Sequence, residues 1–334
     1  MKTGIVFAGQ GAQYPGMGKD LYDNSAEAKK VFDEAGDQVK DWCFYGTKEM
    51  LRQTHITQPS IYTVTMAAYR ALREALAVHP ELAPVMEITG YAGFSLGEYA
   101  ALTAAGAITD MAAGQYIVTK RGNLMNEAGK DAEGNQRGGM AAGFGKRETI
   151  CEVVDAARGD RILEAVNFNS PVQTVVAGEH EALDRFVEMA KEKRVKAKML
   201  SVSTAFHSPL MIPAAKELKK LLLDAGLKAP DHKIYSNVTG RDMMENFDGG
   251  DAGAYISDIM SRQAMSPVYW QETVENMIGD GVKVLIEVGP GKTLSGLAKK
   301  ISKELITLHV EDHESLKKTI NELEEILKTE EEEN

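Results

Sequence analysis

The sequence of 334 residues contains only two cysteines, Cys43 and Cys151, which form no C-x-x-C motif and no cluster with metal-ligand spacing. This scarcity predicts two reduced thiols and excludes a disulfide scaffold or a zinc site. An uninterrupted apolar run of about 18 residues is also missing, which excludes a membrane-spanning helix. The N-terminus has no apolar segment long enough for a secretory signal. We therefore expect a cytoplasmic protein.

Basic residues are too few for a nucleic-acid-binding surface. Lys plus Arg total 38 against 49 for Asp plus Glu, and the formal net charge is −11. Phosphate binding needs a broad basic face, so this balance excludes nucleic acid as a partner. The chain has 43% hydrophobic and 26% charged residues, which is ordinary for a globular protein with a large core. Its length predicts one large domain, or a core with a smaller inserted domain.

Strands alternate with helices in the first third of the chain. Residues 5–8 predict a buried strand that ends in the polar, glycine-rich loop Gly9-Gln10-Gly11-Ala12-Gln13. We expect helices over residues 20–39 and 59–76, the second apolar on most sides and therefore buried. A strand over residues 88–92 leads into an alanine-rich helix. This alternation predicts an α/β fold with a largely parallel sheet.

The middle of the chain has a different order of elements. Behind a glycine-rich connection the pattern predicts strand, helix, strand, strand, helix and strand, the βαββαβ order of a ferredoxin-like unit. We therefore expect a small domain at residues 129–203, inserted into a discontinuous larger domain at residues 1–128 and 204–328. The charge run at residues 329–334 predicts a solvated, disordered tail. The expected elements of the small domain are residues 140–144, 148–158, 162–167, 174–177, 181–191 and 195–202.

The segment Gly93-Phe94-Ser95-Leu96-Gly97 matches the pattern G-x-S-x-G and lies between a predicted strand and a predicted helix. So sharp a turn strains the backbone at the serine and crowds its neighbours, which explains the flanking glycines. The Ser95 hydroxyl would project at the carboxyl edge of the sheet, and the next backbone N–H would face a developing oxyanion. The context favours a nucleophile elbow over a structural turn.

A serine nucleophile needs a base, and histidine is the usual one. Among the seven histidines, His207 stands in a loop with an apolar approach and a proline exit, which indicates a fixed position. From position alone, His207 is either this base or a structural histidine. An acceptor must hold the tautomer of the base, and spacing leaves Asp258, Gln263 and Glu287 open.

Arg121 lies on a mostly apolar helical stretch. One interpretation is a surface arginine whose aliphatic stem packs against the protein. The other is a fork that binds a substrate carboxylate in bidentate geometry.

Seven motifs follow one another in the order found in an enzyme family. With them the chain resembles the malonyl-CoA:acyl carrier protein transacylases of fatty acid synthesis and the related acyltransferase domains of polyketide synthases. The family fold is an α/β-hydrolase-like core with a ferredoxin-like insert, which agrees with the element order above. The motifs are Gly9-Gln10-Gly11-Ala12-Gln13, Thr57-Gln58-Pro59-Ser60, Ser95-Leu96-Gly97-Glu98-Tyr99, Lys120-Arg121-Gly122, Ala205-Phe206-His207, Gln263 ahead of Ser266-Pro267-Val268, and Glu287-Val288-Gly289-Pro290-Gly291.

The resemblance implies catalytic roles for single residues. Ser95 would be the acylated nucleophile, and His207 would be the general base and then the general acid. Gln263 would hold His207 through its carbonyl, in the place where hydrolases use a carboxylate. The backbone N–H groups of Gln10 and Leu96 would form the oxyanion hole.

Further positions concern the acyl group. The resemblance implies that Arg121 pairs with the free carboxylate of malonyl. In the related domains an Ala-Phe-His run accompanies malonyl, because a ring at Phe206 would occupy the space of the α-methyl group of methylmalonyl. One position departs from the family pattern: histidine usually precedes the nucleophile, and this chain has Phe94 there.

The implied function is the transfer of malonyl from malonyl-CoA to the phosphopantetheine thiol of acyl carrier protein, for fatty acid or polyketide synthesis, with no metal and no bound cofactor. The alternatives are a serine hydrolase or acyl-editing thioesterase, a polyketide acyltransferase acting in trans, and a non-catalytic docking module. An acidic carrier protein would need a local basic surface on this acidic chain. The candidate surface, which could also be a solvated helix end, consists of Lys191, Lys193, Arg194, Lys196 and Lys198.

Overall fold

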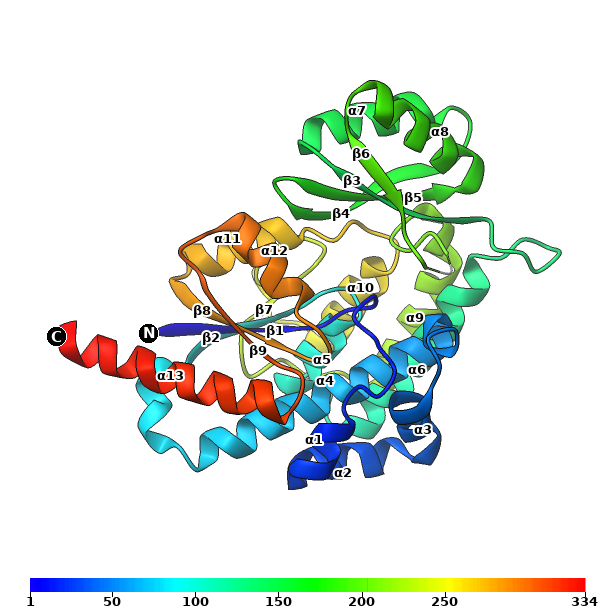
Figure 1. Ribbon diagram of the computed structural model, residues 1–334. Coiled ribbons are helices and arrows are strands. Elements are labelled where there is room, and N and C mark those ends of the chain that lie inside the picture. The colour runs from blue at the N-terminus through cyan, green and yellow to red at the C-terminus, as the bar shows by residue number, and fades with distance from the viewer. Residues whose placement is uncertain (203, 334) are drawn as a thin grey trace.

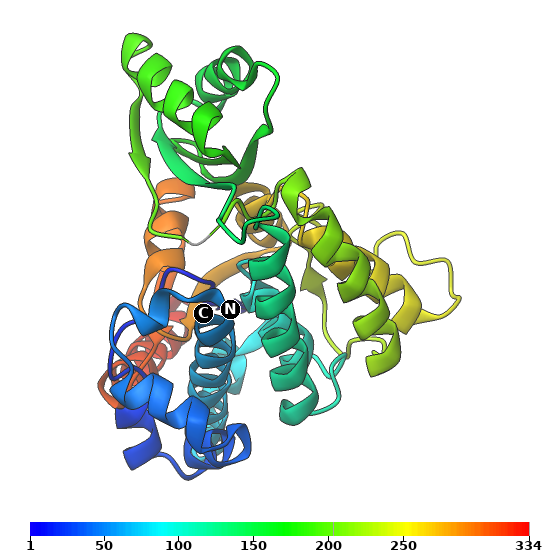
Figure 2. The same cartoon turned by 90° about the vertical axis from the view of Figure 1, so that its right-hand side faces the viewer.

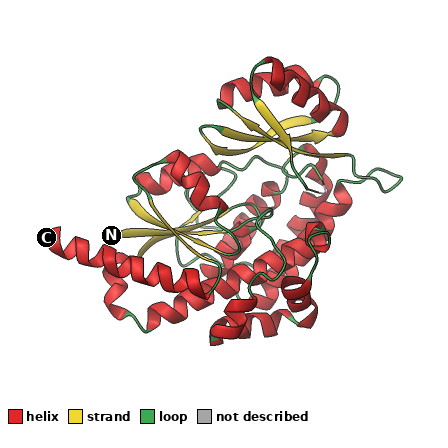
Figure 3. Ribbon diagram, viewed as in Figure 1, coloured by secondary structure: helices red, strands yellow, loops and turns green. Residues whose placement is uncertain are grey.

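A computed structural model of the protein describes residues 1–202 and 204–333. Two separate sheets, each with its own helices, form the fold (Figures 1 and 3). The larger sheet is parallel throughout, with strand order β7-β2-β1-β8-β9, and the smaller one is antiparallel, with strand order β4-β5-β3-β6. The predicted α/β class, with a mostly parallel sheet and a ferredoxin-like insert, is confirmed.

The parallel sheet forms the centre of the larger unit. Both of its faces are covered by helices, so its strands are apolar over most of their length instead of alternating. The side chains of β1 are buried after the first residue, for example. Its strands are β1 (Lys2–Phe7), β2 (Glu87–Gly93), β7 (Ile234–Tyr235), β8 (Val282–Val288) and β9 (Ile306–Val310).

The helix α4 (Thr54–Ala77) crosses beneath this sheet (Figure 1) and is buried along most of its first five turns, as its apolar sequence predicts. Within the described residues, none of the helices has the length and apolarity needed to span a bilayer. The other helices of the larger unit are α1 (Lys19–Asn24), α2 (Ala26–Ala35), α3 (Asp37–Tyr45), α5 (Gly97–Ala104), α6 (Met111–Ala128), α9 (Ile212–Ala225), α10 (Ala252–Gln263), α11 (Trp270–Gly279), α12 (Thr293–Ile301) and α13 (His313–Glu333), with short 3₁₀ turns η1 (Met50–Arg52), η2 (Pro80–Val85) and η3 (Pro209–Met211).

The prediction of one continuous helix over residues 20–39 is wrong, because α1, α2 and α3 occupy this segment. Ser25 ends α1 and caps α2, since its hydroxyl oxygen accepts a hydrogen bond of 3.0 Å from the Ala28 N–H. Gly36, with φ of +89°, then separates α2 from α3. The three short helices pack along one side of α4 (Figure 2), from Cys43 beside Ser60 to Ser25 beside Glu74.

The charge run at the end of the chain predicts a disordered tail at residues 329–334. Up to Glu333 these residues continue α13, and Asn334 lies outside the described residues. Glutamate is a good helix former, and the N-terminal amine of Met1 lies 3.1 Å from the Glu330 carboxylate. The two chain ends therefore lie side by side, as Figure 1 shows.

The antiparallel sheet carries its two helices on one face only (Figures 1 and 2). These helices bury a separate apolar cluster against that face. The expected domain limits at residues 129 and 203 stay predictions, and Ser203 itself lies outside the described residues. The elements are β3 (Gly138–Phe144), α7 (Arg147–Arg158), β4 (Leu163–Ser170), β5 (Gln173–Glu179), α8 (His180–Glu192) and β6 (Lys196–Met199).

A short main-chain junction fixes the small sheet to the larger unit. The Phe168 N–H donates to the Val268 carbonyl at 2.9 Å, and the Val268 N–H donates to Val166 at 2.7 Å. Beside this junction the Phe168 ring stacks on Tyr269 with 5.3 Å between the ring centres. The free face of the small sheet is thereby held toward the carboxyl edge of the parallel sheet, where the predicted site residues lie.

Candidate active site

Ser95 sits in the turn between β2 and α5 with φ of +51°, a conformation that non-glycine residues rarely adopt. Gly97 permits this turn to pack on β1, because a Cβ there would lie only 2.1 Å from the Phe7 carbonyl oxygen. A Cβ on Gly9 would likewise lie 2.4 Å from the Phe94 carbonyl oxygen. The loop after β1 therefore packs directly against the elbow, and Gln10 lines the same cavity as Ser95.

A hydrogen-bonded chain connects Ser95 with His207 and the main chain at Gln263. Ser95 Oγ lies 2.8 Å from His207 Nε2, and His207 Nδ1 lies 2.9 Å from the Gln263 carbonyl oxygen. Because that oxygen can only accept, Nδ1 must carry the proton. The lone pair of Nε2 is then free to accept the proton of the serine hydroxyl, which is the tautomer a general base requires.

The surroundings keep the His207 imidazole neutral. Burial and, to a lesser extent, the positive charge of Arg121 lower its pKa to about 4, against main-chain hydrogen bonds that raise it. At neutral pH the ring is therefore able to accept a proton. His207 also has φ of +61°, so both partners of the Ser95–His207 pair have strained backbones, a feature that clusters at functional sites.

The structure separates the three acceptors that spacing left open for His207. Asp258 is paired with Lys219 and Arg262 at the surface. Glu287 accepts hydrogen bonds from the first N–H groups of α12, at Leu294 and Ser295, and these contacts hold it beside that helix.

Gln263 is the residue that meets the imidazole, and it does so through its main chain. Its side chain makes other contacts: Nε2 donates to the Ser95 carbonyl at 2.7 Å and to Glu98 at 2.8 Å, and Oε1 accepts from Arg121 at 3.1 Å.

Arg121, on α6, is only 2% exposed. Its guanidinium donates to Gln58 Oε1 at 2.9 Å and to Ser95 Oγ at 3.2 Å, and it lies over the Tyr99 ring. Burial lowers the pKa of this group. No carboxylate in residues 1–202 and 204–333 comes within ion-pair distance of it, and its Nε–H has no partner there. A buried, oriented cation without a counter-ion is suited to bind an anionic ligand.

The N–H groups of Gln10 and Leu96 meet no acceptor in the part of the chain that the structure describes. Leu96 directly precedes the first residue of α5, so its N–H belongs to the positive end of that helix. Unpaired donors beside a nucleophile can stabilise negative charge on a carbonyl oxygen. Phe206, the remaining predicted residue, is buried and lines this cavity together with Ser95, Arg121 and His207.

Three residues of the site had no predicted role. Gln58 orients Arg121, while Glu98 and Asn237 are fully buried and hydrogen-bonded around the elbow. Burial raises the pKa of Glu98 to about 7, against hydrogen bonds that lower it. Gln58 and Glu98 lie within the family motifs, so the motifs could have indicated that these two residues belong to the site. Asn237 follows a strand of only two residues, β7, and no sequence pattern pointed to it.

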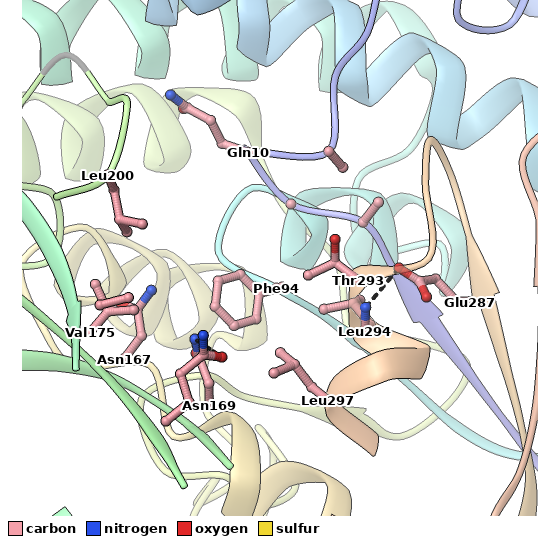
Figure 4. A pocket seen from close by; sticks show the side chains of 16 residues that line it. Gln10, Phe94, Asn167, Asn169, Val175, Leu200, Glu287, Thr293, Leu294 and Leu297 are labelled. Atoms are coloured by element: carbon pink, nitrogen blue, oxygen red, sulfur yellow. Dashed lines mark hydrogen bonds between the residues drawn. The ribbon is translucent and has the colours of Figure 1, made fainter. Parts of the chain in front are cut away.

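A larger cavity adjoins the one lined by Ser95 and His207 and shares Gln10, Phe94, Asn167 and Leu200 with it. In Figure 4 Phe94 lies in the middle of this cavity, with Asn167, Asn169 and Val175 of the small sheet on one side and Leu294 and Leu297 of α12 on the other. Phe94 packs edge-on against Trp270, with 5.4 Å between the ring centres. The two cavities thus lie side by side, and the smaller one reaches Ser95.

Comparison with known proteins gives a consistent family. The acyl transferase domain family matches residues 5–330. The malonyl CoA-acyl carrier protein transacylase of Bacillus subtilis (strain 168) is 37% identical over 331 residues, which cover 97% of this chain and 98% of that protein. The enzyme of the same name from Escherichia coli (strain K12) is 36% identical over 303 residues, or 89% of this chain and 92% of that protein.

Solved structures agree with these relatives. The malonyl CoA-acyl carrier protein transacylase of Clostridium perfringens superposes with a TM-score of 0.88 at 37% identity, covering 99% of this chain and all of the other. A malonyl-transacylase solved in complex with its type II PKS acyl-carrier protein superposes with a TM-score of 0.85 at 33% identity, covering 95% of this chain and 98% of the other.

Proposed function

Because this chain belongs to the family of malonyl-CoA:acyl carrier protein transacylases, we propose that it transfers malonyl from malonyl-CoA to the phosphopantetheine thiol of an acyl carrier protein. The reaction is a ping-pong exchange through a malonyl ester of Ser95. It supplies extender units for fatty acid or polyketide synthesis. The hydrogen-bonded chain from Ser95 Oγ through His207 to the Gln263 carbonyl supports the nucleophile and base that this reaction needs.

In the first half-reaction His207 Nε2 takes the proton of Ser95 Oγ while this oxygen attacks the thioester carbonyl carbon. The carbonyl oxygen becomes negative and is bound by the N–H groups of Gln10 and Leu96, an effect typically worth about 2.7–4 kcal/mol per donor. The carbon–sulfur bond then breaks, and the CoA sulfur receives the proton from His207. Malonyl remains on Ser95 as an ester.

In the second half-reaction the carrier thiol gives its proton to His207 and its sulfur attacks the ester carbonyl. The same two N–H groups bind the oxyanion. The ester bond to Ser95 breaks, and His207 returns the proton to Ser95 Oγ. These side chains and backbone groups supply every step, so the proposed reaction requires no metal and no bound cofactor.

The position of Arg121 supports malonyl as the acyl group. Its Nη2 lies 3.2 Å from Ser95 Oγ, so a substrate that contacts both groups must carry its carboxylate close to the reacting carbonyl. Malonyl has one carbon between the two. Gln58 and Gln263 accept hydrogen bonds from the guanidinium and so hold its Nη2 beside Ser95 Oγ, where a substrate carboxylate would meet it.

Arg121→Ala should lower malonyl transfer roughly 100-fold, about 3 kcal/mol, because the substrate carboxylate loses a buried ionic partner. Acetyl transfer should fall less or rise, since acetyl no longer faces an unpaired guanidinium. Lys120→Ala removes an exposed cation from the same helix and serves as the control. The rate of acyl transfer is measured for both variants with malonyl-CoA and with acetyl-CoA. An equal loss for the two thioesters would remove the carboxylate role of Arg121.

Phe206→Ser should relax the preference for malonyl over methylmalonyl. The buried ring lines the cavity beside His207, and an α-methyl group would overpack it at a typical cost of about 1–3 kcal/mol, or roughly 5- to 150-fold in rate. Competition of the two thioesters for Ser95 measures the preference. Equal labelling of the wild type by both would contradict the steric argument, and an unchanged preference in the variant would place selectivity elsewhere.

The imidazole of His207 should titrate at a pH of about 4 instead of the ordinary histidine value, because burial and Arg121 disfavour its charged form. Above this pH the ring is neutral and can act as the base, and below it the added proton blocks Nε2. NMR titration of labelled histidine, with His207→Ala to assign the signal, tests this directly. A midpoint near the model-peptide value of about 6.5 would be incompatible with the burial seen here.

The cavity of Figure 4 suits the pantetheine arm that CoA and carrier protein share. The arm is a slender chain of apolar carbons interrupted by amides. Phe94, Leu294 and Leu297 offer apolar walls. The Oδ1 atoms of Asn167 and Asn169 are buried without a partner in the described part of the chain, and each can accept an amide N–H.

The carrier-protein surface proposed on the small unit comprises the end of α8 and the strand β6, with Lys193 and Arg194 between them. A related transacylase was solved with a type II PKS acyl-carrier protein bound, which supports such a partner here. Identity of 37% to transacylases over nearly the whole chain favours this function over a thioesterase or a non-catalytic module. The cytoplasmic location stays a prediction.

A further inference from the structure

The strained backbone of Ser95 needs something to hold it. A non-glycine residue at positive φ costs about 1–3 kcal/mol and persists only where its surroundings over-determine it. The turn supplies two main-chain hydrogen bonds of its own, from the Gly97 N–H to the Phe94 carbonyl and from the Glu98 N–H to the Ser95 carbonyl. In addition, both peptide groups of Ser95 are held by side chains that come from distant parts of the chain.

Asn237 bridges the turn with its side-chain amide. Its Oδ1 accepts the Ser95 N–H at 2.7 Å, and its Nδ2 donates to the Gly93 carbonyl at 2.7 Å. One planar amide thus fixes the peptide groups on both sides of Phe94. Asn237 is fully buried and does not line the catalytic cavity, so it acts on Ser95 from behind.

Gln263 holds the other side of the same residue. Its Nε2 donates to the Ser95 carbonyl at 2.7 Å. The N–H and the C=O of Ser95 are therefore both bound to side-chain amides, one from the segment after β7 and one from the end of α10.

Glu98 connects these two amides. Its Oε1 accepts the backbone N–H of Asn237 at 3.1 Å, and its Oε2 accepts Nε2 of Gln263 at 2.8 Å. The side chain is fully buried and follows Ser95 by less than one helical turn. A carboxylate offers two acceptor oxygens and no donor, whereas an amide in its place offers only one acceptor.

We propose that Glu98 and Asn237 are positioning residues that, together with the Gln263 side chain, hold the Ser95 backbone in its strained conformation and so aim Oγ at His207 and the substrate carbonyl. Neither residue touches the substrate. The proposal rests on the function of Ser95 as the nucleophile and extends it to the residues behind the turn.

Two variants separate the arms of this support. Asn237→Ala removes the amide that spans the turn. Glu98→Gln keeps the size of the side chain but has only one acceptor oxygen. Its NH₂ group would face a second donor, either the Asn237 backbone N–H or Gln263 Nε2, and cannot accept from it. Thr3→Val is the matched control, since it removes a buried side-chain hydrogen bond of equal length, 2.7 Å to the Val85 carbonyl. Thr3 lies at the opposite end of the parallel sheet.

Each protein is mixed with malonyl-CoA, and the limiting rate of Ser95 acylation and the half-saturating concentration are measured in single turnover. Asn237→Ala should lower the limiting rate about 100-fold, as displacement of a reacting atom by about 1 Å does, and leave the half-saturating concentration unchanged. In Glu98→Gln the limiting rate should fall roughly tenfold, because the variant loses one hydrogen bond to a charged group. Thr3→Val should keep the wild-type rate at temperatures well below its unfolding midpoint.

A fluorophosphonate probe reports the reactivity of Ser95 independently of the acyl group, since Oγ displaces fluoride from phosphorus. Its labelling rate should fall in parallel. If the probe labels the wild type but malonyl-CoA does not, the proposed function fails and the support of the elbow is still tested.

Three results would each overturn the proposal. One is that Asn237→Ala reacts with the probe at the wild-type rate. The others are a rate loss no larger than the loss of thermal stability explains, as judged from Thr3→Val, and a change in the half-saturating concentration alone. If Asn237→Ala does not fold, the nearly isosteric Glu98→Gln decides the matter, and a wild-type rate of Ser95 acylation in that variant would overturn the proposal.

Discussion

Replacing Ser95 with alanine should abolish the acyl-enzyme while the fold persists. Ser95 Oγ is the atom 2.8 Å from the base and 3.2 Å from Arg121, so no other hydroxyl can take its place in this geometry. Alanine keeps the Cβ, and therefore adds no backbone strain at φ of +51°. Intact-mass measurement after addition of malonyl-CoA should show an unmodified protein.

Ser257→Ala is the matched control for this variant. It removes another buried serine hydroxyl, which donates to the Gly253 carbonyl on α10 away from the elbow, and it should label like the wild type. A malonyl group found on any residue of the Ser95→Ala protein would refute the assignment of the nucleophile.

His207→Ala should slow acylation by about 10²- to 10⁴-fold, the usual contribution of a general base. Without the imidazole, nothing accepts the proton of Ser95 Oγ, and an unassisted serine hydroxyl is a poor nucleophile at neutral pH. Because His207 has φ of +61°, the alanine variant keeps the strain of the native backbone. Single-turnover acylation by malonyl-CoA measures the loss.

Two further variants isolate the loss of the base. His207→Gly removes the imidazole and relieves the backbone strain, so it should be as slow as His207→Ala. His232→Ala removes a histidine that lies against Tyr91 and should keep the wild-type rate. Acylation by His207→Gly at the wild-type rate would contradict the role of His207.

The turn that holds Ser95 could be predicted from sequence because it depends on a local pattern. The pattern of a strand, a G-x-S-x-G turn and a helix predicts an elbow with an exposed serine hydroxyl. His207 differs from the other histidines because its loop has an apolar approach and a proline exit. The insert was recognisable because its strands and helices follow the βαββαβ order. The break of the expected helix at Ser25 and Gly36 was missed, since one apolar stripe continues across both residues.

Most supports of the site could not be predicted from local patterns, because they come from contacts between distant segments. The acceptor of His207 is a main-chain carbonyl, which leaves no mark in the residue pattern, so only the family resemblance pointed to Gln263. Asn237 reaches the elbow only because β7 pairs with β2, and a strand of two residues shows no periodicity. The end of α13 meets Met1 from the other end of the chain, a contact that no local pattern predicts.

The most direct test of the function is the mass of the wild-type protein and its carrier through one cycle. With malonyl-CoA alone, the protein should gain one malonyl group, located on Ser95 by peptide mapping. Addition of phosphopantetheinylated acyl carrier protein should return the enzyme to its original mass and place malonyl on the carrier thiol. An adduct on another residue, or release of free malonate at the same rate without the carrier, would contradict a transacylase.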